Sequence, residues 1–259
     1  MKPVTFTKSG LDLLAIQMKW TLFSLGIFTL INVIQKFFSS NVDSFYYAGY
    51  ISSNIYMFVI GIIAISFLTH YVENGITRKN YFYGNVIASI GLSIIIPIIL
   101  YVVNLVELFI INRFTAFTSD NISINSIMVD VVNDVDGNII AEIVLSMILS
   151  PFISLETNVI LSLSLFSINI FVFYIIGWLI GAAFQRLGVI GGLLFIIIGV
   201  TLIGVKDSML RLALDTPLFK SFSFLEVVPE ALALPVIFLV IVATLIMIRL
   251  LTKRTSISM

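Results

Sequence analysis

The sequence contains no cysteine, one histidine and few charged residues, and each shortage excludes a class of protein. Without cysteine the chain can form neither disulfides nor thiolate metal sites. Charged residues make up 11% of its 259 residues, whereas about 25% is usual in soluble domains. Basic and acidic residues are equal in number, at 14 each, so the charge balance gives no indication of a nucleic-acid partner.

Catalytic motifs are also missing. No GxxxxGK(S/T) sequence occurs, so we expect no nucleotide site and no cofactor in this chain, and we expect it not to be an enzyme. His70 forms an HxxE pair with Glu73, but one histidine without HExxH cannot hold a catalytic zinc ion in the usual way. No GxSxG motif accompanies the many serines, which leaves a serine hydrolase without support.

Apolar residues dominate what is present: they make up 59% of the chain, and the mean hydropathy is +1.14. Several runs of about 20 apolar residues recur, each long enough to cross a hydrocarbon core of about 30 Å as a helix. We therefore expect one all-α integral membrane domain over 1–259 with six transmembrane helices. The predicted spans are about 20–38, 49–69, 85–106, 159–184, 189–205 and 231–251.

Residues 1–19 precede the first span and predict an amphipathic interfacial helix at the membrane surface. Ser9 and Asp12 fit a capping box, which would start this helix at Ser9. An apolar stripe with helical spacing and a polar boundary residue mark the helix, namely Leu11, Leu14, Met18 and Lys19. The alternative is that the segment simply extends the first span into the cytoplasm.

Two polar regions, 107–158 and 206–230, are predicted as outer loops. Within the first, 139–155 is apolar enough to imitate another span, but it is short for a crossing and Ser150-Pro151 interrupts it. A crossing there would also place Lys253 and Arg254, near the C-terminus, outside, against the positive-inside rule. We therefore expect an interfacial or re-entrant helix on the outer side.

The basic residues determine the predicted orientation. With six spans and both termini in the cytoplasm, nine basic residues fall inside and five outside. The cores of the spans hold almost no ionisable residues. Ion-coupled transporters and proton pumps usually need such a group near the middle of the bilayer, so the sequence argues against that class.

The stretch between the second and third spans, 70–84 (HYVENGITRKNYFYG), is a basic polar island. Asn74-Gly75 favours a turn because both residues tolerate positive φ. Thr77 can then cap a new short helix that presents Arg78 and Lys79 to the cytoplasm. Aromatic residues follow at once, as is typical of re-entry into the bilayer. From the residues alone, an ordinary loop that only fixes the topology fits equally well.

Small residues recur at a spacing that favours close helix packing. Gly177 and Gly181 form one GxxxG motif, and Gly188 and Gly192 repeat it across the next turn. Such residues let helices approach closely, either inside a bundle or in a dimer. The motif is common in membrane helices and does not identify an interface by itself.

This layout resembles the permease subunits of type-2 ATP-binding-cassette exporters. A surface helix, six spans, the basic loop ENGITRKNYFYG and the tight turn at 184–188 carry the resemblance. In that family the loop reads as glycine, a basic pair and then aromatic residues. The matching positions here are Gly75, Thr77, Arg78, Lys79, Tyr81 and Phe82.

The resemblance implies that 70–84 is a coupling helix that docks on a separate ATPase. Glu73, Arg78 and Lys79 would make the polar contacts, while Tyr81 and Phe82 would anchor the loop. Two ATPase subunits, which would hold ATP and Mg, would work with two copies of the permease or with one copy and a paralogue.

The resemblance also implies a location and a cargo. Relatives in Gram-positive bacteria export amphipathic toxin or antimicrobial peptides, so we expect the bacterial cell membrane and an amphipathic peptide or hydrophobic substrate. Two alternatives stay open: an ATP-independent transporter or channel, and a non-transporting sensor or immunity subunit. A partner ATPase would favour the exporter over both.

Overall fold

The computed structural model describes residues 6–38, 45–114, 138–148, 150–153, 155 and 157–253. Over those residues the chain forms helices and short connections and no strand, which confirms the predicted all-α class for that part of it. The helices in chain order are α1 (Phe6–Phe38), α2 (Phe45–Glu73), α3 (Arg78–Phe114), α5 (Ile139–Ile148), α6 (Val159–Ala213), η1 (Lys220–Val227), η2 (Glu230–Leu232) and α7 (Ala233–Lys253).

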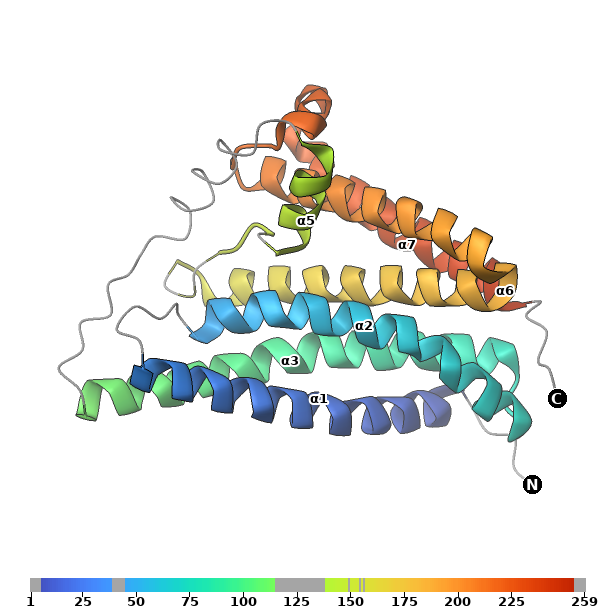
Figure 1. Ribbon diagram of the computed structural model, residues 1–259, viewed down its shortest axis with the longest axis horizontal. Helices are drawn as coiled ribbons and strands as arrows, with labels where there is room; N and C mark the ends of the chain where they lie inside the picture. The colour runs from blue at the N-terminus through green and yellow to red at the C-terminus, as the bar shows by residue number, and fades with distance from the viewer. Residues whose placement is uncertain are drawn as a thin grey trace.

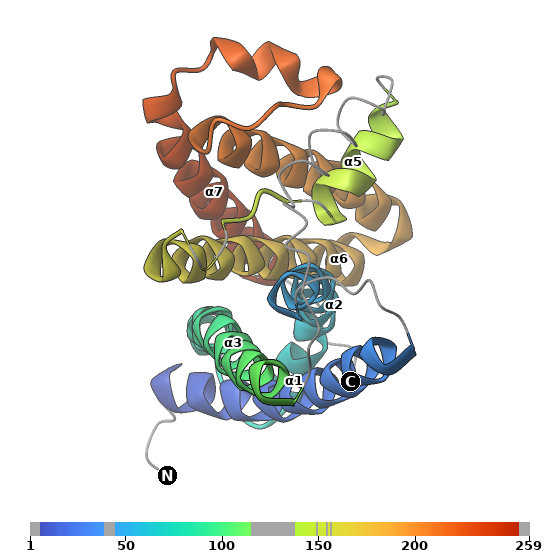
Figure 2. The ribbon, with the colours of Figure 1, turned by 90° about the vertical axis from the view of Figure 1, so that its left-hand side faces the viewer.

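The long helices form three layers (Figures 1 and 2). α1 and α3 make one outer layer, α2 and the first part of α6 lie in the middle, and the rest of α6 with α7 makes the other outer layer. The main core lies between α2, α3 and α6, where Phe173, Tyr174 and Trp178 are fully buried. α1 begins and α7 ends at the same end of the bundle (Figure 1).

α6 is a bent helix with two arms. Gly188 has φ 69° and ψ −165°, a non-helical conformation that separates the arms 159–187 and 189–213. Only glycine adopts this part of backbone space readily, because a Cβ would clash there. The arms fold back on each other, since a Cβ built on Gly199 would lie 2.9 Å from a side-chain carbon of Ile180. The bend therefore falls at the tight turn that the sequence predicts.

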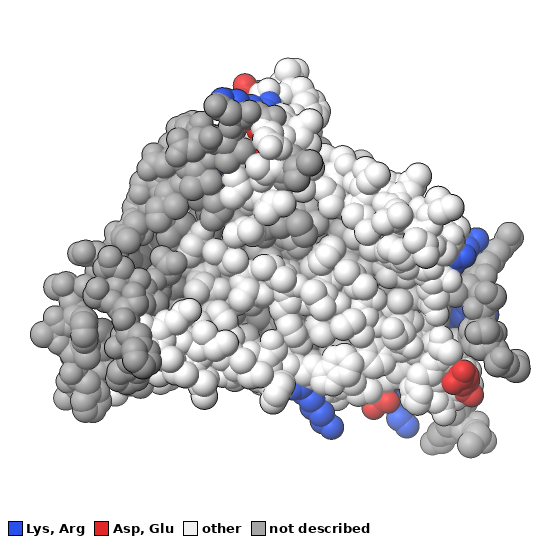
Figure 3. All heavy atoms as spheres, in the orientation of Figure 1, with Lys and Arg blue, Asp and Glu red and all other residues white. Residues whose placement is uncertain are grey.

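Among the residues that the structure describes, five helices are long and apolar enough to cross a membrane: α1, α2, α3, α6 and α7. α6 has 55 residues, and each of its arms is longer than the roughly 20 residues that one crossing needs. On the face shown in Figure 3, the described charged side chains lie along the edges and the centre consists of other residues. These features indicate a multi-pass membrane protein.

α1 is one continuous helix, whereas the sequence predicts an interfacial helix over 1–19 and a separate span. The capping-box prediction is wrong, because Ser9 is buried inside the helix and its hydroxyl donates to the carbonyl of Phe6 at 2.9 Å. Neither proline nor glycine occurs between Leu11 and Leu25, so nothing in the backbone ends the helix near Trp20.

The predicted apolar stripe of α1 packs only in part. Leu14 and Met18 are half-buried against the core, and Lys19 is exposed. Leu11 is 59% exposed, while Leu13, which lies off the predicted stripe, is fully buried. The packed face of α1 is therefore rotated by roughly 100°, the step between adjacent helical residues, from the predicted stripe.

α3 and α6 extend beyond the predicted spans, which shortens the predicted loops. α3 begins at Arg78 and runs to Phe114, so 78–84 and 107–114 are helical. α6 continues to Ala213, so the predicted outer loop 206–230 starts with two turns of helix. Its last turns pack Met209 and Leu210 on α7, and this packing keeps the chain helical beyond the first charge.

α5 has ten residues, which is about 15 Å of helix, half of what a crossing of about 30 Å requires. This length agrees with the prediction that 139–155 is not a span. After α5, the hydroxyl of Tyr50 donates to the carbonyl of Pro151 at 3.0 Å and so fixes the following segment to α2. The predicted loop residues 115–137 lie outside the described residues.

The α2–α6 contact is a backbone contact made possible by glycine. A Cβ built on Gly177 would lie 2.1 Å from the carbonyl oxygen of Phe58, and one on Gly61 would lie 2.1 Å from that of Tyr174. Gly181 approaches α2 in the same way. The first GxxxG motif therefore packs within the bundle.

The two glycines of the second GxxxG motif, Gly188 and Gly192, have different structural roles. A Cβ built on Gly192 would meet the ring of Phe184, so Gly192 packs within the α6 hairpin. A Cβ on Gly188 would meet no atom of the described chain within 4 Å. Gly188 is needed for its backbone conformation and makes no helix contact of the predicted kind.

Candidate functional site

The α2–α3 turn is shorter than the predicted loop, because within 70–84 only Asn74–Thr77 are non-helical. Gly75 has φ 84°, as the Asn-Gly turn prediction requires. The amide of Asn80 donates to the Thr77 hydroxyl at 3.1 Å, which confirms Thr77 as a helix cap. The capped helix is α3 itself, with 37 residues, so the prediction of a separate short helix is wrong.

The predicted coupling residues divide into an exposed set and a buried set. Glu73, Gly75, Thr77 and Lys79 are exposed, Arg78 is half-buried, and Tyr81 and Phe82 are buried. The hydroxyl of Tyr81 donates to the carbonyl of Ala64 in α2. The rings of Tyr81 and Phe82 lie 6.4 and 5.4 Å from the ring of Trp178 in α6. The two aromatic residues therefore fix the start of α3 to the core.

A group of basic residues surrounds this turn, and we call it the basic end: Arg78, Lys79, Arg186, Arg249 and Lys253. Arg186 donates to the carbonyls of Leu250 and Leu251, the latter at 3.3 Å, and Arg78 donates to that of Lys253 at 3.4 Å. These carbonyls belong to the last turn of α7, where no intrahelical partner is available. A cation there also opposes the negative end of the helix dipole.

Arg249 completes the connection between the turn and α7. It donates to the carbonyl of Arg78 at 3.4 Å, and its guanidinium lies 5.5 Å from the ring centre of Phe82. Displacement of the turn would therefore reach α7 through Arg249 and α6 through Trp178. The arrangement suits an element that receives a mechanical input.

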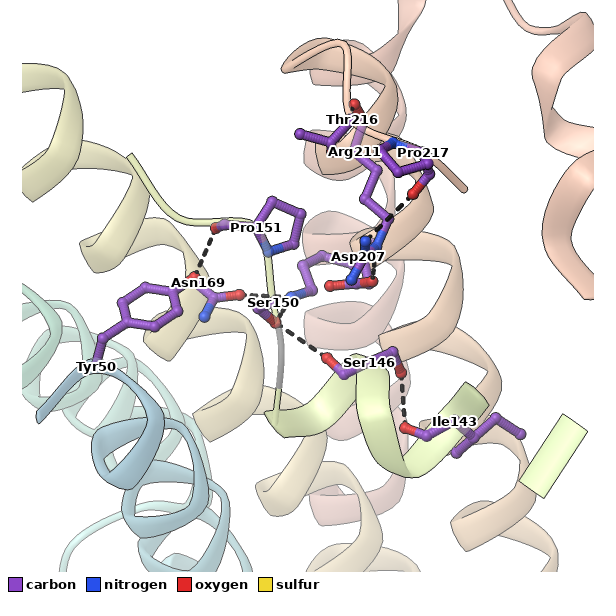
Figure 4. Close-up of polar contacts among 11 residues, drawn as sticks. Tyr50, Ile143, Ser146, Ser150, Pro151, Asn169, Asp207, Arg211, Thr216 and Pro217 are labelled. Carbon is purple, nitrogen blue, oxygen red and sulfur yellow. Dashed lines mark hydrogen bonds and ion pairs between the residues drawn. The ribbon is translucent and has the colours of Figure 1, made fainter. Parts of the chain in front are cut away.

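At the opposite end of the α6 hairpin lies a buried polar cluster, formed by Ser150, Asn169, Lys206, Asp207 and Arg211 (Figure 4). The amine of Lys206 donates to Asn169 Oδ1 and to the hydroxyl of Ser150, the latter at 3.2 Å. The Asn169 amide donates in turn to Asn54 Oδ1 at 2.8 Å. These bonds join both arms of α6, the segment after α5, and α2.

The second half of the cluster is an ion pair on the second arm of α6 (Figure 4). Arg211 Nε donates to Asp207 Oδ2 at 2.7 Å, and both side chains are fully buried. Arg211 also donates to the carbonyl of Pro217 at 3.2 Å and lies 4.3 Å from the ring centre of Phe219. Asp207 Oδ1 is buried and has no hydrogen-bond partner among the described residues.

Sequence reasoning missed this cluster, because it assigned 206–230 to an outer loop. The acceptors of Lys206 lie 37 and 56 residues away along the chain, too far for any local pattern to indicate. One signal was present: Asp207 and Arg211 have the i, i+4 spacing of a helical ion pair directly after an apolar run.

Comparison with known proteins gives no family for the chain, since no family model, curated protein or solved structure matches it. The class that the fold defines is a helical, multi-pass membrane protein. Its function has to be argued from the basic end and the buried polar cluster.

Proposed function

We propose that this chain is the membrane-spanning permease subunit of an ATP-driven exporter, with the α2–α3 turn as the docking site for a separate ATPase subunit. One observation carries the proposal: Glu73 and Lys79 are exposed at a turn whose next residues, Tyr81 and Phe82, are buried in the core. Docking requires an exposed polar surface, and transmission requires a firm attachment to the bundle.

The bend at Gly188 supports six crossings, with α6 supplying two of them. The α2–α3 turn, the bend of α6 and the end of α7 then share one side of the membrane. Because the basic end lies there, the positive-inside rule assigns that side to the cytoplasm, together with both termini. The turn is then accessible to a cytoplasmic ATPase.

The working assembly in this proposal has two ATPase subunits, which hold ATP and Mg, and two permeases, either identical or paralogous. It lies in a bacterial cell membrane. The largely apolar helix surfaces suit an amphipathic or hydrophobic cargo, for which we propose a peptide. ATP-driven closure of the two ATPases would displace the two turns and, through Trp178 and Arg249, the helices behind them.

A pair of charge exchanges tests the docking site. The variant Glu73→Lys/Lys79→Glu reverses both exposed charges at the turn without altering the net charge. Its matched control, Lys220→Glu/Glu226→Lys, exchanges two exposed charges with the same six-residue separation at the other end of the bundle. We expect the first variant to lose the co-expressed ATPase during affinity purification and the control to retain it. Equal retention by both variants would refute the proposed docking site.

The buried polar cluster favours a second candidate, an ATP-independent, ion-coupled transporter. The sequence argues against that class because the predicted spans lack ionisable residues. Lys206, Asp207 and Arg211 are nevertheless buried within a helix long and apolar enough to cross a membrane. Substrate movement in proteoliposomes that is driven by a proton gradient, with no ATPase present, would support this candidate. A protein that moves no substrate under either condition would fit a sensor or immunity subunit.

A further inference from the structure

A partly open cleft of about 220 Å³ lies between α1, α2 and α3, away from both the basic end and the buried polar cluster. Thr21 and Phe28 line it from α1, Ser53 and Tyr56 from α2, and Ile96 from α3. Ile96 is the central residue of α3 by position, and Thr21 is close to the centre of α1. In a chain that spans a membrane, the cleft therefore lies at the depth of the lipid tails.

The hydrogen bonds of the cleft leave groups without partners. The Thr21 hydroxyl donates to the carbonyl of Gln17 at 2.9 Å and lies 2.9 Å from the Tyr56 hydroxyl. Because the single proton of Thr21 is already used, Tyr56 is the donor of that pair and its oxygen can accept another bond. Ser53 Oγ is buried and has no partner among the described residues. In a medium without water, unpaired hydroxyls are costly, so a ligand that bonds to them gains affinity.

The remaining lining indicates an apolar, uncharged ligand. Leu25, Phe28 and Ile96 supply aliphatic and aromatic surface, and no Lys, Arg, Asp or Glu occurs among the lining residues. Ile27 and Ile31, also in the lining, are each 47% exposed, so the cleft opens at the lipid-facing side of α1. A dry cavity of about 150 Å³ takes up benzene. The cleft, at about 220 Å³, is about half as large again as that cavity, which suits an alkyl chain of roughly eight carbons.

We propose that this cleft binds an uncharged amphiphile with a hydroxyl group and an alkyl chain of about eight carbons, which enters from the bilayer. The hydroxyl donates to the oxygen of Tyr56 and accepts from Ser53, and the chain lies against Phe28 and Ile96. A phospholipid acyl chain would match the apolar walls but would leave Ser53 Oγ without a partner and the acceptor site of Tyr56 unused. This binding site requires that the chain spans a membrane, but it does not depend on the proposed exporter function.

Photolabelling of the full chain in phosphatidylcholine nanodiscs tests the proposal, with the photoreactive alcohol 3-azioctanol as the probe. We expect saturable labelling of α1 and α2 at the cleft, competed by 1-octanol and much more weakly by octane. Tyr56→Phe keeps the ring and removes the acceptor, so competition by 1-octanol should weaken by about fivefold, the equivalent of one ordinary hydrogen bond. Ser164→Ala, which removes an exposed hydroxyl in α6, should have no effect.

Two results would overturn the proposal. Equal competition by octane and octanol would mean that the cleft accepts any acyl chain and recognises no hydroxyl. Labelling that rises linearly with probe and spreads over lipid-facing residues would mean that no site exists. A thermal melt of Tyr56→Phe shows whether the variant is folded, and Ser53→Ala gives an independent measurement if it is not. No ATPase is present, so these outcomes are separate from those for the docking site.

Discussion

The backbone contact between α2 and α6 predicts that Gly177→Ala strongly destabilises the protein. A Cβ at this position would lie 2.1 Å from the carbonyl oxygen of Phe58. Carbon atoms approach carbonyl oxygens to about 3.3 Å, so the two helices would have to separate by roughly 1.2 Å at this point. The obstructing atom is part of the backbone of α2 and cannot rotate away as a side chain could.

The expected loss in the free energy of unfolding follows from the packing contacts that this separation weakens. A gap of about 1 Å removes up to half of the dispersion energy of the facing atoms, and overpacking typically costs about 1–3 kcal/mol. The higher helix propensity of alanine returns about 0.5–1 kcal/mol. Because the obstructing atom is backbone and the seam adjoins the fully buried Trp178, we expect the upper half of the overpacking cost and hence a net loss of about 1–2.5 kcal/mol. For a chain of this size, that corresponds to a Tm lower by roughly 2–10 °C.

Tryptophan fluorescence during thermal unfolding in lipid-containing detergent measures the effect, since Trp178 lies one residue from the substitution. Gly26→Ala is the matched control, because a Cβ on Gly26 would meet no described atom within 4 Å. That variant should melt at the parental temperature or slightly above it. If Gly177→Ala melted together with Gly26→Ala, the α2–α6 backbone contact would be refuted.

Three further predictions concern other parts of the fold. Gly188→Ala should cost about 1–3 kcal/mol in thermal stability, because alanine is strained at φ 69° and ψ −165°, and an unchanged Tm would contradict the bend. Arg211→Met should cost about 3–5 kcal/mol by leaving Asp207 buried without its cation, and adding Asp207→Leu should recover much of that loss in a double-mutant cycle. Simple additivity would argue against the ion pair. Thr77→Ala should cost about 1 kcal/mol and speed amide hydrogen exchange in the first turn of α3, whereas unaltered exchange would exclude the cap.

The sequence was sufficient for features that depend on local chemistry. The apolar runs locate the long helices, because about 20 apolar residues satisfy the length and solvation requirements of a crossing. The turn at Asn74-Gly75 and the cap at Thr77 follow from positive φ and from a hydroxyl at a helix start, and both are present. The bend at Gly188 falls at the predicted turn for the same reason.

Helix ends were predicted poorly, because hydropathy ends a span at its first charge. The backbone bonds of α6 continue through Lys206 to Ala213, since distant acceptors bond to Lys206 and the i, i+4 pair of Asp207 and Arg211 satisfies the other two charges. In α1 the prediction separated a surface helix from a span at Trp20, although only a helix-breaking residue or a competing cap could divide them. Long-range packing, which no local pattern encodes, determines where α6 ends, whereas the continuity of α1 follows from the lack of a helix-breaking residue near Trp20.

The buried polar cluster also changes how the two candidate functions can be separated. The exporter proposal rests on the basic end, whereas the ion-coupled alternative rests on Lys206 and Asp207 at the other end of the α6 hairpin. Lys206 is held by neutral acceptors and Asp207 by Arg211, so the cluster can be neutralised stepwise without disturbing the α2–α3 turn. An exporter should tolerate Lys206→Met once the folded state is retained, because its energy enters at the turn. An ion-coupled transporter should lose its gradient dependence with the same substitution, and keep its activity when Glu73 and Lys79 are exchanged.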